Sequence, residues 1–275
     1  MRIFVAGATG AIGRRLVPLL VAHGHQVTAL SRRASAVDGV TTVAGDVYDA
    51  ERLRELVVAA RPEVVMHQLT DLGSRDFAAN SRLRREGTRN LVDAALAAGV
   101  RRIVAQSIAW AYEPGPTPAT EATPLDLHAT DPHRRTTVEA VATLEAITAE
   151  APEWVVLRYG MLYGPDTWYT KGGLMADLAA AGKLPAGADV TSFLHVEDAA
   201  GAAVAALSWP SGPVNVVDDE PAPADAWAPA FAESAGAPTP TYAGPRTPWA
   251  RGASNTHART LGWTPTPPTW RAGFG

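Results

Sequence analysis

A glycine-rich turn near the start of the chain constrains the fold more than any other feature of the sequence. Gly7, Gly10 and Gly13 lie between a short apolar run, residues 3–5, and an amphipathic segment that begins near Ile12. Glycine lets the backbone bend sharply and approach a bound anion, and a helix that follows directs its free N–H groups at the same point. The pattern predicts a strand–turn–helix unit that binds the pyrophosphate of a dinucleotide.

Strand-like and helical segments alternate along the next 150 residues. Amphipathic segments separate five further strand-like runs, at residues 26–30, 41–43, 64–66, 102–107 and 154–158. Strands that alternate with helices of about 10 to 15 residues indicate a doubly wound parallel sheet. We therefore expect an α/β, Rossmann-type fold in which residues 1–165 form the dinucleotide-binding domain. Residues 166–275 are expected to form a small C-terminal subdomain that binds the substrate and is interleaved with the sheet.

Composition excludes several classes of protein. The chain has 275 residues, a formal net charge of -4 and no cysteine. Such a charge provides no basic field for nucleic acid or an anionic membrane, and disulfide and thiolate chemistry are ruled out. No apolar run approaches the roughly 20 residues of a membrane-spanning helix, and the first strand starts too early for a signal peptide. We expect a cytoplasmic protein that acts on a small molecule, with no nucleic-acid or membrane partner and no metal site.

The end of the second strand indicates which dinucleotide binds. Ser31, Arg32 and Arg33 follow the apolar run at residues 26–30. A carboxylate at this place would hold the ribose 2′-hydroxyl of NAD, whereas an arginine pair offers charge-assisted donors to a 2′-phosphate. The sequence favours NADP, with NAD as the alternative cofactor. A solvated basic turn without a ligand is the other interpretation of the two arginines.

Further motifs follow the glycine turn in a characteristic order. They are Gly45-Asp46-Val47, Met66-His67-Gln68-Leu69, Leu157-Arg158-Tyr159, Leu162-Tyr163-Gly164-Pro165 and the block at residues 193–200. This order, over essentially the whole chain, resembles the extended short-chain dehydrogenase/reductase family, which includes nucleotide-sugar epimerases and dehydratases. The resemblance implies a homodimer that forms through the helical segments at residues 80–98 and 134–149. It also implies a set of cofactor contacts: Gly7, Thr9, Gly10, Ile12, Gly13, Ser31, Arg32, Arg33, Asp46, Val47, Gln68, Leu69, Tyr159 and Leu162.

The proton relay of that family is missing from this sequence. The family uses a Tyr and a Lys four residues apart on one helix, and here Thr137 and Val141 occupy those places when Glu145 is aligned with the acidic residue that follows. The hydroxyl partner is also displaced, because Ser107 lies five residues before Tyr112 instead of four. A shift of one residue along a strand turns a side chain to the other face. The active site is therefore expected to be non-standard.

Two histidines offer a replacement for the missing pair. His128 and His133 lie on either side of Asp131 in a predicted lid loop, where an imidazole can act as an acid or base near neutral pH. The alternative is a polar loop that leads into the next helix. We take Ser107, Tyr112 and His133 as the candidate catalytic residues.

The substrate is expected to be a small, aromatic or hydrophobic molecule rather than a sugar nucleotide. Met161 occupies the place where nucleotide-sugar members of the family have an Asn that contacts the substrate diphosphate. Aromatic residues nearby would line an apolar pocket, unless they belong to the core: Trp110, Tyr112, Trp168 and Tyr169.

Three functions remain open at this point. The first is an NAD(P)-dependent oxidoreductase of atypical extended short-chain type that acts on a small, aromatic or hydrophobic metabolite. The second is an isomerase, epimerase, dehydratase or cyclase that keeps the cofactor without net redox change. The third is an NAD(P)-sensing regulatory protein without turnover. Consumption of NADPH, turnover without consumption, and binding without turnover distinguish the three.

Overall fold

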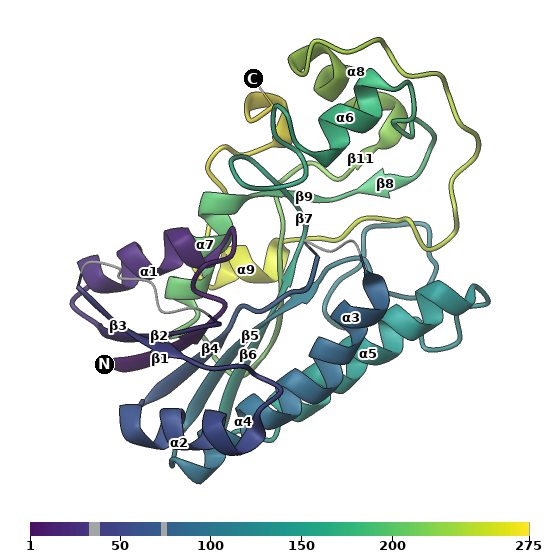
Figure 1. Cartoon of the computed structure of the whole chain (residues 1–275). Coiled ribbons are helices and arrows are strands. Elements are labelled where there is room, and N and C mark those ends of the chain that lie inside the picture. Colours follow the sequence, from purple (N-terminus) through teal and green to yellow (C-terminus); the bar gives the residue numbers. More distant parts are fainter. Residues whose placement is uncertain (33–38, 73–75, 275) are drawn as a thin grey trace. The chain divides into compact units, whose positions relative to one another are not determined.

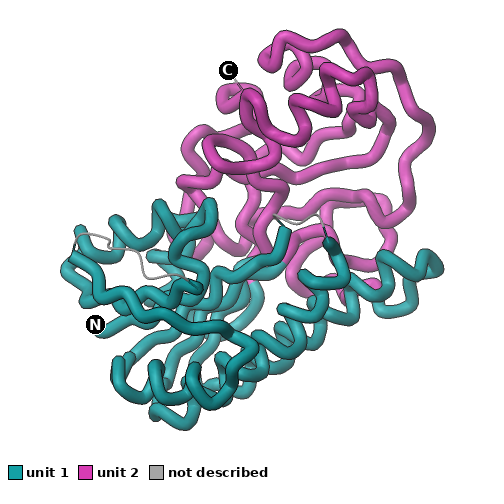
Figure 2. Tube along the Cα trace, in the orientation of Figure 1, with its two compact units in different colours: residues 1–107, 127–157, 200–213 teal, residues 108–126, 158–199, 214–275 magenta. Residues whose placement is uncertain are grey.

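The chain divides into two compact units. The structure, a computed structural model, describes residues 1–32, 39–72 and 76–274. Figure 2 shows the two units in different colours: residues 1–107, 127–157 and 200–213 form unit 1, and residues 108–126, 158–199 and 214–275 form unit 2. Each unit thus takes three separate segments of the chain, whereas the sequence suggested one boundary at residue 165.

A seven-stranded sheet carries the motifs predicted to bind a dinucleotide, and its strand order is β10-β6-β5-β4-β1-β2-β3. Figure 1 shows strands β1 to β6 of this sheet side by side. Its members are β1 (Arg2–Ala6), β2 (Gln26–Ser31), β3 (Val40–Ala44), β4 (Val64–His67), β5 (Arg102–Ile108), β6 (Glu153–Tyr159) and β10 (Gly212–Val216). β1 pairs in parallel with both β2 and β4, and the remaining described pairs, β2 with β3 and β4 with β5, are also parallel. The predicted doubly wound α/β fold is confirmed, and β10 adds a seventh strand to the six that the sequence indicated.

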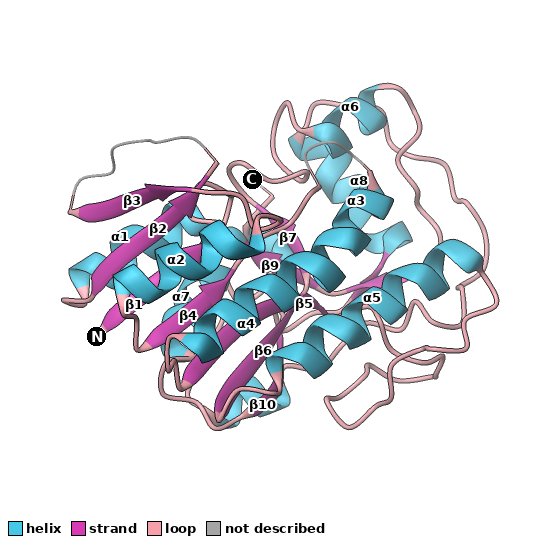
Figure 3. Cartoon of the chain, turned by 60° about the horizontal axis from the view of Figure 1, so that its bottom comes forward, coloured by secondary structure: helices cyan, strands magenta, loops and turns pink. Residues whose placement is uncertain are grey.

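Helices cover both faces of this sheet (Figure 3). On one face lie α2 (Ala50–Ala60), α4 (Thr88–Ala97) and α5 (Pro132–Thr148), and on the other lie α1 (Gly13–Ala22) and α7 (Val196–Ala205). Apolar side chains of β1, β4 and β5 pack with those of α2 and α4, as Phe4, Val65, Ile103, Leu53 and Leu91 do. Burial on both faces explains why the strands are continuous apolar runs without alternation.

The helical stretch predicted at residues 80–98 has an internal change of geometry. It consists of α3 (Phe77–Arg82), a π-helical turn η1 (Leu83–Gly87) and α4. A π-helical turn contains an extra residue compared with an α-helical turn. It changes the apolar periodicity too little to be recognised from the sequence. Such turns are frequent at functional sites.

Unit 2 has short strands, short helices and an aromatic core. β7 (Met161–Tyr163) pairs with β9 (Phe193–His195), and β8 (Val190–Thr191) pairs with β11 (Ala222–Pro223). The helices are α6 (Leu174–Ala180), α8 (Ala224–Ser234), α9 (Thr256–Thr260) and the 3-10 turn η2 (Trp270–Ala272). Its core contains Tyr163, Tyr169, Phe193, Trp227, Phe231, Trp270 and Phe274, with Trp168 packed against it. Tyr169 and Trp168 therefore belong to the core of unit 2, which is the alternative to a role in lining a substrate pocket.

Among the helices of the described residues, none has the length and apolar character needed to cross a membrane.

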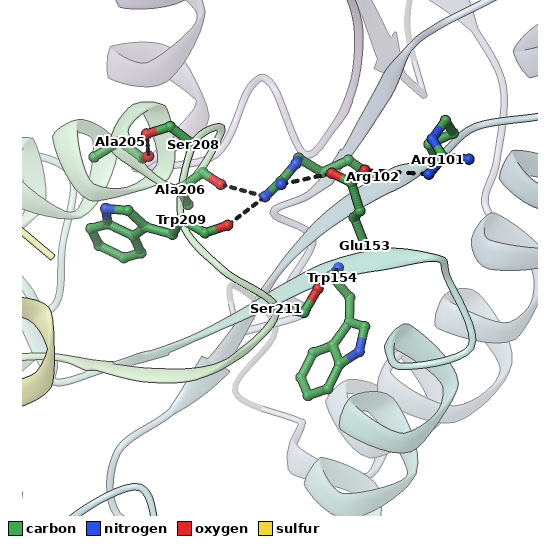
Figure 4. A network of polar contacts seen from close by, with 9 residues as sticks. All are labelled: Arg101, Arg102, Glu153, Trp154, Ala205, Ala206, Ser208, Trp209 and Ser211. Carbon is green, nitrogen blue, oxygen red and sulfur yellow. Dashed lines mark hydrogen bonds and ion pairs between the residues drawn. The ribbon is translucent and has the colours of Figure 1, made fainter.

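An arginine at the start of β5 binds two carbonyl groups that follow α7 (Figure 4). Arg102 donates from Nη1 to the carbonyl oxygens of Ala206, at 3.2 Å, and Trp209, at 2.9 Å. Its Nη2 donates to Glu153 Oε2 at 2.7 Å, and the Arg102 side chain is 16% exposed. The largely buried guanidinium thus joins β5, β6 and the end of α7 within unit 1.

We expect Arg102→Met to lower the free energy of unfolding by about 2–4 kcal/mol, because two carbonyl groups and one carboxylate lose a charged donor in a largely buried place. Urea denaturation measures this loss. Arg101→Met is the matched control, since the Arg101 side chain is 73% exposed and lies 3.6 Å from Glu153. Its effect should stay within about 0.5 kcal/mol. Equal effects of the two variants would contradict the assignment.

Candidate functional site

The three glycines of the first turn meet three different demands. Gly7 has φ +95°, and a Cβ there would lie 2.4 Å from the backbone oxygen of Gln68. A Cβ on Gly13 would lie 2.1 Å from the Gly7 oxygen, so Gly13 allows α1 to pack against the end of β1. Gly10 has neither constraint: its φ is not positive, and the nearest protein atom to a Cβ would be the Gly7 oxygen at 3.4 Å. The free space at Gly10 fits the close approach of a dinucleotide pyrophosphate.

The start of α1 also fits a bound anion. Ile12 is the N-cap residue of α1 and makes no side-chain cap hydrogen bond, and the first turn has no acidic residue. α2 and α5 differ, because Asp49 and Asp131 accept backbone N–H groups at their N-termini. Ile12 is buried, whereas Thr9 is exposed in the turn. An uncapped N-terminus behind a glycine turn presents N–H donors and a positive dipole end to phosphate.

The ends of β2 and β3 bring the next predicted residues together. Gly45 donates its backbone N–H to the carbonyl oxygen of Ser31 at 3.0 Å, which places the exit of β3 beside the end of β2. Arg32 and Asp46 are exposed there, and Val47 is buried. Arg33 lies outside the described residues.

Polar residues follow β4 at the neighbouring point of the same sheet edge. Gln68 is 4% exposed and donates its backbone N–H to Ala6 at 2.8 Å. Leu69 donates its backbone N–H to His67 Nδ1 at 3.3 Å, and His67 Nε2 lies 2.9 Å from Thr88 Oγ1. Burial, with a smaller contribution from nearby Arg84, lowers the pKa of His67 to about 4, so this imidazole is neutral at physiological pH.

The remaining two predicted cofactor residues lie in unit 2. Tyr159 is buried and donates its hydroxyl to the carbonyl oxygen of Ala199 at 3.0 Å. Leu162 is a half-buried residue of β7 and lies opposite Leu194 of β9. The glycines, Ser31, Arg32, Asp46, Val47, Gln68 and Leu69 lie together in unit 1 at the carboxyl ends of the first four strands, where open α/β sheets bind ligands.

Ser107 takes part in a largely buried charged cluster, in which Glu145 is half-buried. Ser107 is 5% exposed, and its hydroxyl donates to Glu145 Oε1 on α5 at 2.8 Å. Arg84, on the π-helical turn, is 8% exposed and interacts electrostatically with Glu145. Burial lowers the pKa of Arg84 to about 10, which still leaves it charged at neutral pH. The hydroxyl proton of Ser107 is thus donated to a carboxylate of α5, and the role of Ser107 in catalysis stays a prediction.

Tyr112 is held inside unit 2. It is 1% exposed, and its hydroxyl donates to Asn215 Oδ1 while it accepts a hydrogen bond from Arg158 Nη1 at 2.9 Å. The Arg158 guanidinium carbon lies 5.0 Å from the centre of the Tyr112 ring. Asn215 also donates its side-chain amide to Ala119 at 3.3 Å. Both hydrogen-bonding functions of the phenol are occupied, which favours a structural role over the predicted role in proton transfer.

The other candidate acid and base positions offer little support for a relay. His128 and His133 are exposed, and His133 lies in the first turn of α5. Thr137 donates its hydroxyl to the carbonyl oxygen of His133 at 3.0 Å, and Val141 is fully buried. In the part of the chain that the structure describes, no group of three or more His, Cys, Asp or Glu side chains is arranged to hold a metal ion.

The burial of the polar residues Arg84, Arg158 and Asn215 was not predicted, although Arg158 lies in one of the motifs that carry the family resemblance. One signal was available for Arg84: Arg84, Thr88 and Leu91 recur at helical spacing and are all buried. An arginine on the apolar stripe of a helix indicates a buried charge that needs a partner. No comparable signal exists for Arg158 and Asn215, because their partner, Tyr112, is far away in the sequence.

Comparison with known proteins identifies the family. The model of the NAD dependent epimerase/dehydratase family matches residues 3–217 of this chain. The chain belongs to this family. The resemblance to extended short-chain dehydrogenases/reductases is thereby confirmed. Membership of this family also supports the expectation that the protein is an enzyme.

Relatives and solved structures extend this result. A 3-diazoavenalumate denitrifying reductase from a Streptomyces species is 52% identical over 100% of this chain and 99% of the relative. A ceramide reductase from Caulobacter vibrioides is 30% identical over 74% of this chain and 60% of its own length. The Thermus thermophilus UDP-glucose 4-epimerase in complex with NAD is similar with a TM-score of 0.76 and 25% identity, covering 100% of this chain and 98% of that one. The Bordetella bronchiseptica enzyme WbmG with NAD and UDP has a TM-score of 0.79, at 22% identity over 96% and 89% of the two chains.

The glycine turn generates a test of cofactor binding. We expect Gly10→Val to abolish binding of NAD(P)H, because its branched side chain fills the space for the pyrophosphate, while circular dichroism and the melting temperature stay near those of the unaltered protein. Titration calorimetry measures the binding. Gly13→Val is the contrasting variant and should unfold the protein through its clash with the Gly7 oxygen. Near-native affinity in Gly10→Val would show that the turn is only a structural connection.

Proposed function

We propose that the protein is an NAD(P)H-dependent reductase that removes the diazo group of a small aromatic substrate as dinitrogen. The observation that carries this proposal is the 52% identity to a diazo-substrate denitrifying reductase along the full length of both chains. The glycine turn, the uncapped N-terminus of α1 and the unpartnered amide of Gln68 after β4 support a dinucleotide site in the same chain.

The chemistry is consistent with the side chains that this protein has. The nicotinamide would supply a hydride to the ring carbon of an arenediazonium ion, the carbon–nitrogen bond would break with its electron pair leaving on N₂, and the products would be the arene, dinitrogen and the oxidised cofactor. No proton enters or leaves in this exchange. A carbonyl reductase, by contrast, has to protonate an alkoxide.

The positions of the family's proton relay support this assignment. Thr137 and Val141 have no group that titrates near neutral pH, and Ser107 is bound to Glu145. Tyr112 is buried with both functions of its hydroxyl occupied. The chain's own task is then to bind the cofactor, to orient the aromatic ring and to exclude water, and loss of the relay does not impair a reaction that transfers hydride alone.

A labelling experiment tests the reaction. With 3-carboxybenzenediazonium as probe, we expect one N₂ and one benzoate for each NADPH consumed, and NADPH deuterated at nicotinamide C4 should place deuterium at the carbon that lost nitrogen. Mass spectrometry and gas analysis measure both. Thr137→Ala, Val141→Ala and Tyr112→Phe should keep the rate of hydride transfer within roughly ten-fold, since none supplies a proton. Gly10→Val is the control for direct reduction of the probe by free NADPH.

Other outcomes would select another function. Turnover of the probe without NADPH consumption would indicate a non-redox enzyme that retains its cofactor. Cofactor binding without turnover of any diazo probe would indicate a sensing role. A loss of more than about a hundred-fold in Thr137→Ala would show that proton transfer from this helix limits the reaction, contrary to the proposal.

We also propose that NADP(H) is the preferred cofactor. Arg32 is exposed at the end of β2, where a guanidinium can donate charge-assisted hydrogen bonds to a 2′-phosphate. Such contacts contribute about 1.5–3 kcal/mol, or roughly ten- to hundred-fold in affinity. Arg32→Ala should remove this preference in calorimetric titrations of NADP and NAD, whereas Arg101→Ala, which removes the same charge elsewhere, should preserve it. Equal affinity of the unaltered protein for both cofactors would refute the preference.

A further inference from the structure

The side-chain amide of Gln68 is buried without a hydrogen-bond partner. Gln68 is 4% exposed, and neither Oε1 nor Nε2 forms a hydrogen bond with any residue that the structure describes. A buried donor or acceptor that is left unsatisfied costs about 1–3 kcal/mol, and native proteins keep few such groups. An amide with both of its ends unsatisfied indicates a place where a ligand completes the hydrogen bonding.

Gln68 lies directly beside the glycine turn of unit 1. Its backbone N–H donates to Ala6, and its backbone oxygen lies against Gly7, where a Cβ would approach it to 2.4 Å. β1 and β4 are neighbours in the sheet, although β2 and β3 come between them in the chain. This is the point where the winding of the sheet reverses and where doubly wound folds bind a dinucleotide.

The other polar side chains at this edge have partners within the protein. His67 Nε2 lies 2.9 Å from Thr88 Oγ1, Gln106 Nε2 donates to the carbonyl oxygen of Leu69 at 3.4 Å, and Ser107 donates to Glu145. Within this group of described residues, Gln68 is therefore the one whose side-chain amide lacks a hydrogen-bond partner in the protein.

The chemistry of an amide restricts which part of a dinucleotide it can bind. The amide has donors at Nε2 and an acceptor at Oε1, both of which need partners. A phosphate only accepts hydrogen bonds, and its charge would repel the lone pairs of Oε1. A carboxamide and a ribose diol each donate and accept, so either can satisfy both ends of the Gln68 side chain.

We propose that Gln68 binds the nicotinamide-riboside half of the cofactor through hydrogen bonds that its side-chain amide both donates and accepts. This assignment rests on the use of a nicotinamide cofactor in the proposed function, but not on the identity of the substrate. It makes Gln68 a positioning residue for the end of the cofactor that reacts, separate from the glycine turn and from Arg32.

Gln68→Leu provides the test, with Gln68→Met as a second apolar replacement if the leucine variant folds poorly. Calorimetric titration should show NADPH binding weakened by roughly ten- to hundred-fold, while 2′,5′-ADP, which lacks the nicotinamide riboside, binds as it does to the unaltered protein. The cofactor-free variant should melt no lower than the unaltered protein, because two unsatisfied buried atoms have been removed. Gln106→Leu is the matched control and should leave NADPH affinity unchanged.

Two cofactor fragments identify which group Gln68 contacts. Binding of ADP-ribose 2′-phosphate weakened by Gln68→Leu would support contact with the ribose diol. If that ligand is unaffected while NADPH is weakened, the carboxamide is the partner. Unchanged NADPH affinity, an equal loss for 2′,5′-ADP, or a lower melting temperature of the cofactor-free protein would each overturn the proposal. These measurements involve no substrate, so they remain interpretable if the diazo probe is not turned over.

Discussion

The close approach of Gly13 to the carbonyl oxygen of Gly7 is the contact on which the start of unit 1 depends. A Cβ on Gly13 would come within 2.1 Å of that oxygen, so only glycine lets α1 start directly against the end of β1. This packing aims the uncapped N–H groups of α1 at the turn, and it leaves the space at Gly10 open to a ligand. The order of the surrounding strands then adds the ends of β2, β3 and β4 to the same edge.

The polar groups near this edge differ in how far the protein itself satisfies them. His67 and Ser107, which could have been proton donors, are buried and hydrogen-bonded to other side chains of unit 1. His67 is also kept neutral by a pKa near 4. Gln68 is the contrasting case, with donor and acceptor atoms that lack a described partner. Under the proposed function, such a site would bind and orient the cofactor and would exchange few protons, which is what the proposed transfer of a hydride to a diazonium carbon requires.

Local signals account for what the sequence predicted correctly. Alternating apolar and helical segments predicted the doubly wound sheet, and the glycine spacing predicted the turn at residues 7–13. Local patterns could not predict features that depend on contacts between residues far apart in the sequence. The seventh strand, β10, pairs with β6 more than 50 residues earlier, and Tyr112 is buried by contacts to Arg158 and Asn215. The π-helical turn at residues 83–87 follows from backbone geometry that apolar periodicity does not encode.

The interleaved path of the chain has a consequence for synthesis. Unit 1 needs residues 200–213 and unit 2 needs residues 108–126, so neither is a continuous stretch of polypeptide. A ribosome that has made the first 165 residues has released most of unit 1 without the strand that completes its sheet and with a loop that belongs to unit 2. Domains of a simple tandem protein can fold one after the other as they emerge. Here both units stay incomplete until late in translation, and an N-terminal fragment would expose an edge strand open to pairing with another chain.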